Sequence, residues 1–235
     1  MIPESSAKAF AALAERVYAT GDSAQVYRAV VDLAPVVVDG CDHACIMLLS
    51  RGVITTAAAT SPVAAAIDDF EKALGEGPCL DAILDEQPQC DPDIATGSPW
   101  PRLAARVLRD TAVRGMIGFR LLVDGRKEGA LNLFSETPGA FTATSLDQAS
   151  VVAAFASVVL MTTSARQQAK DLSAGLASNR EIGKAVGLLM AAHRVTEQEA
   201  FGILDRTSQD LNLKLAEVAV RVVEGQQSQV RPRTG

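Results

Sequence analysis

Apolar residues recur every three or four positions over one long stretch, from Ser145 to about His193. This spacing is typical of an amphipathic helix, and two parallel seven-residue series along it are mostly apolar or small. Such a helix is able to lie along its own copy. We therefore predict a connector helix over residues 145–175 and a homodimer whose coiled-coil seam contains Val151, Phe155, Val158, Leu172, Leu176 and Asn179. The alternative is one helix packed on its own domain, with a break at Gly175 or Gly183.

Residues 1–144 alternate between strand-like and helical patterns. Met116 to Val123 and Glu128 to Phe134 form the clearest strand pair, because Asp124-Gly125 between them favours a tight turn. Residues 44–50 and 53–59 predict a second hairpin. Helices are expected over 5–20, from Asp22 or Ser23 to about Pro35, and over 67–74, 80–85 and 102–113, with an irregular segment over 87–101. Strands with flanking helices in one unit predict an α+β domain with an antiparallel sheet.

Three helices separated by short loops are predicted at the C-terminal end. Arg180 to His193 has one apolar side, and Thr196 with Glu199 forms a capping box that starts the second helix. A third helix begins near Leu215. Short loops force the three helices to fold onto one another, so we predict a bundle over 176–225 and a disordered tail over 226–235.

Composition narrows the class of protein. Hydrophobic residues make up 48% of the 235 residues, which is typical of a globular chain. The first ten residues lack the pattern of a signal peptide, and the longest apolar run is too short for a membrane span. We therefore expect a cytoplasmic protein without membrane contact, whose cysteines Cys41, Cys45, Cys79 and Cys90 are reduced thiols.

Charge differs between the two ends of the chain. Residues 1–164 carry a net charge of −8, whereas residues 165–235 carry +2. An acidic surface repels nucleic acid, so only the C-terminal part is a candidate for binding it.

The C-terminal region resembles the ANTAR domain, an RNA-binding antitermination module. The resemblance rests on Arg180 to Met190, on Glu199 to Leu204 and on Leu215 to Ala219. Small residues within these segments, such as Ala185 and Ala200, fit close helix contacts. The resemblance implies binding to paired stem-loop hairpins in nascent transcripts.

The region before it resembles a GAF domain of the type fused to ANTAR domains in actinobacterial regulators. Here the matching segments are Gly75 to Ala82, the Trp100-Pro101 pair and Gly129 to Leu133. This second resemblance implies a sensory or dimerising domain, with an unknown small molecule as its ligand if it has one. The two together imply a GAF-like antiparallel sheet, a long connector helix and a three-helix ANTAR bundle.

RNA binding requires cations spaced to meet phosphates. Arg180 and Lys184 lie four positions apart on one face of a helix, and we expect them and Lys214 to contact RNA. The full set of candidates is Arg180, Lys184, Arg194, Arg206, Lys214 and Arg221. An ordinary solvated helix surface is the alternative interpretation.

Two other functions remain open on the sequence. The three helices could bind duplex DNA, and Cys79 with Cys90 could form the redox pair of a GAF-type methionine sulfoxide reductase. The segment from Cys41 to Cys45, with His43, has residue types that bind metals, but its spacing lacks a second ligand pair. No catalytic triad or paired carboxylates can be placed, so we expect no enzyme activity, no metal and no cofactor.

Overall fold

The computed structural model describes residues 8, 10–15, 22–50, 53–85, 87–123 and 126–230. The chain divides into two compact units, residues 1–164 and 165–235. In the first unit, residues 10–15 are helical, and the remainder of the helix expected over 5–20 mostly lies outside the described residues. Both predicted tight turns, at 51–52 and 124–125, also lie outside them.

A five-stranded antiparallel sheet forms the centre of the first unit, with strand order β2-β1-β5-β4-β3. Both predicted hairpins are confirmed. The strand β3 falls in the segment expected to be irregular, so that expectation was wrong there. Its three residues are too few to show an alternating pattern. The strands are β1 (His43–Ser50), β2 (Val53–Ala59), β3 (Gln89–Asp91), β4 (Gly115–Val123) and β5 (Arg126–Ser135).

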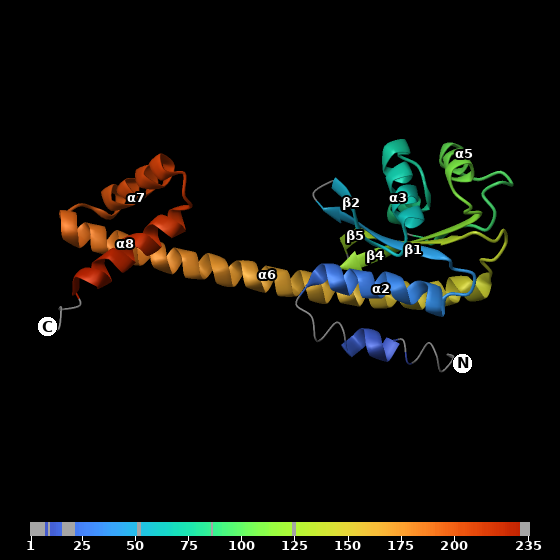
Figure 1. The fold of residues 1–235 in the computed structure, drawn as a ribbon, viewed down its shortest axis with the longest axis horizontal. Helices are drawn as coiled ribbons and strands as arrows, with labels where there is room; N and C mark the ends of the chain where they lie inside the picture. The colour runs from blue at the N-terminus through green and yellow to red at the C-terminus, as the bar shows by residue number, and fades with distance from the viewer. Residues whose placement is uncertain are drawn as a thin grey trace. The chain divides into compact units, whose positions relative to one another are not determined.

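Helices cover both faces of this sheet (Figure 1). On one face lie α2 (Ser23–Val37) and the start of α6 (Ala143–His193), and on the other α3 (Pro62–Leu74), α4 (Pro78–Asp85) and α5 (Pro101–Asp110). Alternate residues of a strand point to opposite faces. In β1, Ile46 accordingly packs in the α2/α6 core, whereas Cys45 and Met47 pack under α3 and α4.

The Gly-rich segment between α3 and α4 connects three helices. Gly75 ends α3 in the left-handed conformation, with φ of 68°. The Glu76 carboxylate accepts a 2.7 Å hydrogen bond from the backbone N–H of Leu103, in the first turn of α5. The Trp100 indole N–H donates a 2.7 Å hydrogen bond to Asp81 of α4. These contacts give the glycine-rich segment and the Trp-Pro pair a structural role.

The helix α6 runs without interruption through Gly175 and Gly183, so the break at either glycine does not occur. From the sequence we expected no apolar run long enough for a membrane span, but α6 is long and apolar enough to cross a membrane by length and composition, with a mean hydropathy of 1.5 in its most apolar window. Within the first unit, Val152, Ala156 and Val159 of α6 are buried against the sheet. This packing accounts for apolar residues on that side of the helix.

The second unit is the predicted three-helix bundle. The end of α6 packs with α7 (Glu197–Leu211) and α8 (Leu215–Val230). The capping box is present at the start of α7, and Asn212 ends α7 in the left-handed conformation with φ of 50°. The helix α8 extends to Val230, so it includes the first five residues of the predicted tail over 226–235. The rest of the predicted tail lies outside the described residues.

Candidate RNA interface and sensory core

The core of the bundle determines which side chains face solvent. Its buried residues come from all three helices: Ala185, Val186, Ala200, Leu204, Val218, Ala219 and Val223. Small side chains at 185, 200 and 219 allow the helices to approach closely. All six predicted RNA-binding cations lie off this core and are exposed. The structure therefore leaves each of them accessible to a ligand.

Arg180 and Lys184 share one acidic neighbour. Lys184 Nζ lies 2.8 Å from the Glu181 carboxylate, and Arg180 Nε lies 3.7 Å from it. The hydrogen bond from Lys184 lowers the pKa of Glu181 below its ordinary value. Even so, the side chains of Arg180 and Lys184 are 72% and 49% exposed, so the pairing leaves both in contact with solvent. Exposed ion pairs of this kind are weak.

The remaining four cations come from the other parts of the bundle. Arg206 lies on α7, and Lys214 and Arg221 lie before and within α8. Arg194 directly follows α6 and has a φ of 52°, a backbone conformation that residues other than Gly, Asn and Asp rarely adopt. A glycine would end this helix at lower conformational cost, so an arginine here is a candidate for a functional position.

The predicted dimer seam divides into two groups. Val151, Val158, Leu172 and Leu176 are 47%, 53%, 66% and 63% exposed, and Asn179 is exposed as well. Phe155 instead packs against its own domain, with its ring 5.7 Å from that of Phe10 in an edge-to-face arrangement. The sequence pattern could not show this contact, because Phe10 lies 145 positions earlier in the chain.

A buried polar cluster lies between α3 and the sheet in the first unit, and the sequence did not predict it. Asp68 and Glu71 of α3 and Asn132 of β5 are each 0% exposed. Asp68 accepts hydrogen bonds from Asn132 Nδ2 at 3.3 Å, from Cys45 Sγ at 3.5 Å and from the Thr56 hydroxyl. Glu71 Oε1 accepts one from the backbone N–H of Cys79 at 3.5 Å.

Among the described residues, two oxygens of this buried polar cluster have no hydrogen-bond partner: Glu71 Oε2 and Asn132 Oδ1. Burial raises the pKa of Glu71 well above its ordinary value, and the neighbouring Asp68 charge raises it further. Burial also raises the pKa of Asp68, although the Thr56 hydroxyl and Lys72 oppose that shift. Because the acidic residues occur at the core-facing spacing of Ala64 and Ile67, helical periodicity could have revealed them.

Cys79, Cys41 and His43 each contact different residues of the first unit. Cys79 is fully buried with its Sγ 3.4 Å from Met47 Sδ, and burial raises its pKa well above the ordinary value. Cys41 Sγ donates to the backbone carbonyl of His43, and burial raises the pKa of Cys41 to about 12. The His43 ring lies 3.0 Å from Ser61 Oγ and 3.1 Å from Glu136 Oε1. These contacts attach the start of β1 to α3 and to the end of β5.

Two family models match the chain. The GAF domain model matches residues 20–161, and the ANTAR domain model matches residues 170–223. GAF domains are sensory, and ANTAR domains are RNA-binding antitermination modules. No curated protein matches the chain.

Solved structures share the fold of the first unit. The GAF domain of a phosphoenolpyruvate-protein phosphotransferase from Coxiella burnetii is 14% identical with a TM-score of 0.53, covering 70% of this chain and 97% of that one. A domain of a putative two-component sensor histidine kinase from Sinorhizobium meliloti is 18% identical with a TM-score of 0.50, covering 62% and 95%. The reduced form of fRMsr from Staphylococcus aureus is 11% identical with a TM-score of 0.50, covering 68% and 96%. At these identities the likeness extends to the fold alone.

The sequence-based expectation of a GAF-like sheet followed by an ANTAR bundle is thus confirmed. A GAF model that spans more than half of the chain, followed directly by an ANTAR model, places this protein in the family of GAF–ANTAR regulators.

Proposed function

We propose that this protein is a cytoplasmic, homodimeric antitermination regulator that holds paired RNA hairpins with its two ANTAR domains under the control of its GAF domains. The observation that carries the proposal is the exposure of all six predicted cations on a bundle matched by the ANTAR model. Exposed cations can neutralise RNA phosphates and release the counterions condensed on them.

A gel shift that compares hairpin RNA with duplex DNA at equal salt tests this function directly. Sequencing the RNA that copurifies with the protein supplies natural hairpins for the assay. We expect tighter binding to hairpin RNA than to duplex DNA of the same length. Equal or tighter binding to duplex DNA would instead support the alternative, a DNA-binding regulator.

The exposed apolar residues of α6 support the dimer. Leu172 and Leu176 lie one turn apart and are more than 60% exposed, and Val151 and Val158, in the part of α6 that belongs to the first unit, are also exposed. A second copy of α6 would cover these side chains. The seam residues that we retain for this contact are Val151, Val158, Leu172, Leu176 and Asn179.

Sedimentation equilibrium of a variant with charged residues in the seam tests the proposed dimer. We expect Leu172→Lys with Leu176→Lys to shift the protein from dimer to monomer. The matched control is Gln167→Lys with Ala174→Lys, which adds the same charge on the opposite side of the same exposed helix. A dimer that survives in the first variant, or dissociates equally in both, would refute the seam.

The sensory part of the proposal rests on Glu71 Oε2 and Asn132 Oδ1, which have no hydrogen-bond partner within the part of the chain that the structure describes. Buried polar atoms without partners favour a ligand that hydrogen-bonds to them. Thermal-shift measurements with a panel of small amines, amides and nucleosides would find such a molecule, and the hairpin gel shift would then show whether it changes RNA affinity. If no molecule that binds the protein changes its affinity for RNA, the sensory part of the proposal is refuted.

Burial of Cys79 favours the regulatory function over the sulfoxide reductase. A thiolate nucleophile needs a lowered pKa and access to its substrate, whereas Cys79 is 0% exposed with a raised pKa. The reductase would show thiol-dependent turnover of methionine sulfoxide that Cys79→Ser abolishes. Such turnover would overturn the assignment of a regulator without enzyme activity.

A further inference from the structure

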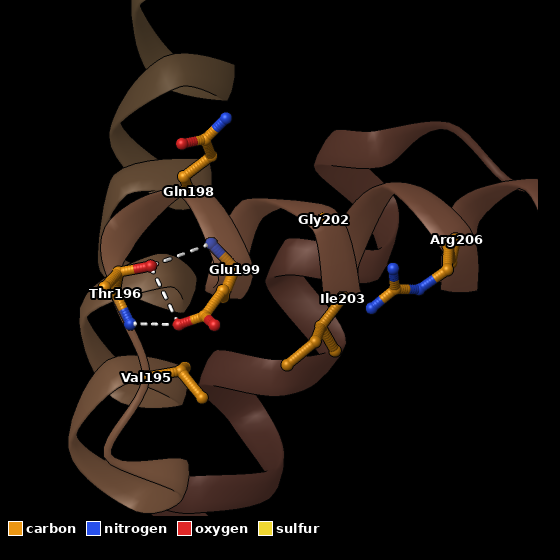
Figure 2. Close-up of a pocket in the computed structure, with 7 residues that line it drawn as sticks. All are labelled: Val195, Thr196, Gln198, Glu199, Gly202, Ile203 and Arg206. Atoms are coloured by element: carbon orange, nitrogen blue, oxygen red, sulfur yellow. Dashed lines mark hydrogen bonds between the residues drawn. The ribbon is translucent and has the colours of Figure 1, made fainter.

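The surface of α7 carries a notch that the predicted RNA contacts leave unexplained (Figure 2). It is a hollow of about 640 Å³ whose lining includes Val195, Glu199, Gly202, Ile203 and Arg206. Glu199, Gly202 and Arg206 are spaced one turn apart and so lie along one side of α7. The missing side chain at Gly202 opens the middle of that side, and an added Cβ would meet only the Arg206 guanidinium, at 3.9 Å.

The two ends of the notch have opposite charge. Arg206 extends back along α7 toward Gly202, whereas Glu199 turns toward Thr196 (Figure 2). Glu199 Oε2 accepts hydrogen bonds from the Thr196 backbone N–H and hydroxyl, both at 2.8 Å. Its second oxygen, Oε1, is in no hydrogen bond among those of the described residues. The backbone hydrogen bond lowers the pKa of Glu199, so the carboxylate stays ionised at neutral pH.

This arrangement suits a nucleobase better than a phosphate. The Glu199 charge repels phosphate, and the capping box already occupies the helix end that would attract it. A planar guanidinium stacks on bases, and a free carboxylate oxygen accepts hydrogen bonds from the amino groups of guanine, adenine or cytosine. Proteins read single-stranded RNA through such stacking and base-edge contacts.

We propose that the α7 notch receives one unpaired, amino-bearing base of the bound RNA loop, stacked on Arg206 with its amino group donating to Glu199 Oε1. This inference rests on the proposed RNA-binding function and adds the source of its loop specificity. It separates the six cations into one that reads a base, Arg206, and five that meet the backbone.

Selection from a pool of RNA hairpins with a fixed stem and a randomised loop tests the notch. Wild-type protein should enrich an amino-bearing base at one loop position and discriminate roughly tenfold against uracil there. Gly202→Leu fills the notch and should lose this preference while it keeps the salt dependence of binding. Arg206→Lys keeps the charge without the flat guanidinium and should weaken the preference in the same way.

Gly225→Leu is the control, because it makes the same substitution in an open helical position of the same unit. Both leucine variants should fold, since leucine is a better helix former than glycine. If the wild type selects a loop base and Gly202→Leu selects it equally well, the notch is refuted and RNA binding stands. If the wild type retains no hairpin from the pool, the proposed function fails and the notch with it.

Discussion

The GAF and ANTAR units of this chain treat their charged residues in opposite ways. In the GAF unit, Asp68 and Glu71 are fully buried against the sheet, and their pKa values are raised. In the ANTAR unit, the predicted cations are exposed, and the pKa values of Glu181 and Glu199 are lowered. Buried carboxylates depend on the packing around them, whereas exposed cations depend on salt. The comparison predicts that the stability of the GAF unit is sensitive to substitutions in its core, whereas RNA binding by the ANTAR unit is sensitive to ionic strength.

The largest expected effect is on the packing around Glu71. Gly77 has a φ of 153°, and a Cβ there would collide with the Glu71 carboxylate. We expect Gly77→Ala to lower the free energy of unfolding of the GAF unit by about 2–4 kcal/mol. Gly75→Ala is the matched control, because it adds only the cost of a left-handed alanine, about 1 kcal/mol, with no atom within 4 Å of the new Cβ. Equal losses in denaturant titrations would show that Glu71 is not tightly enclosed.

The second prediction concerns the pH dependence of stability. A carboxyl whose folded pKa is raised binds its proton more tightly in the folded state, so its contribution is greatest at low pH. That contribution is lost as the pH rises from the ordinary carboxyl range through the folded pKa of Glu71. Glu71→Gln removes the ionisation, and we expect it to raise the free energy of unfolding by about 1–3 kcal/mol at neutral pH. Denaturant titrations at a series of pH values should therefore show that the free energy of unfolding of Glu71→Gln falls less with rising pH than that of the wild type.

For surface carboxylates of the ANTAR unit, the contribution to stability should change with pH in the opposite direction. The lowered pKa of Glu181 gives a contribution that is present above the ordinary carboxyl range and is lost as the pH falls through the folded pKa. Glu181→Gln is thus the control for Glu71→Gln. If the stability difference between variant and wild type changed with pH in the same direction for both substitutions, the comparison would be contradicted.

Sequence patterns predicted most of the fold because its elements are locally encoded. The capping box of Thr196 and Glu199 and the apolar side of the helix before it defined the bundle, and the strand pairs were visible as apolar runs. Features that depend on contacts between distant residues were harder to predict from the sequence. Whether Phe155 faces a partner or its own domain depends on Phe10, and the notch at Gly202 is defined by a side chain that is absent.

Candidate residues divide in the same way. The cations could be chosen from the sequence because exposure is the default for Arg and Lys. Burial of Asp68 and Glu71 could be suspected only from their spacing, since the hydrogen-bond donors come from β1, β2, β5 and α4.

A smaller effect is expected at the end of α6. Arg194→Gly relieves the left-handed arginine, whose φ is 52°, and should stabilise the ANTAR unit by about 1 kcal/mol. The same change removes a proposed phosphate contact and should weaken hairpin binding. Opposite shifts in the melting temperature and in RNA affinity would distinguish a functional cation from a structural one. A variant that gains stability and binds RNA as before would remove Arg194 from the interface.

The most direct test of the central claim is the salt dependence of hairpin binding when Arg180, Lys184 and Lys214 are all replaced by glutamine. Each lost phosphate contact lowers the slope of log affinity against log salt by about one, so we predict a slope lower by about three. The control replaces Arg102, Arg106 and Arg109 of α5 by glutamine, which removes the same charge from the GAF unit and should leave the slope unchanged. A slope that is the same in the wild type and in the Arg180, Lys184 and Lys214 variant would contradict an RNA interface on this bundle.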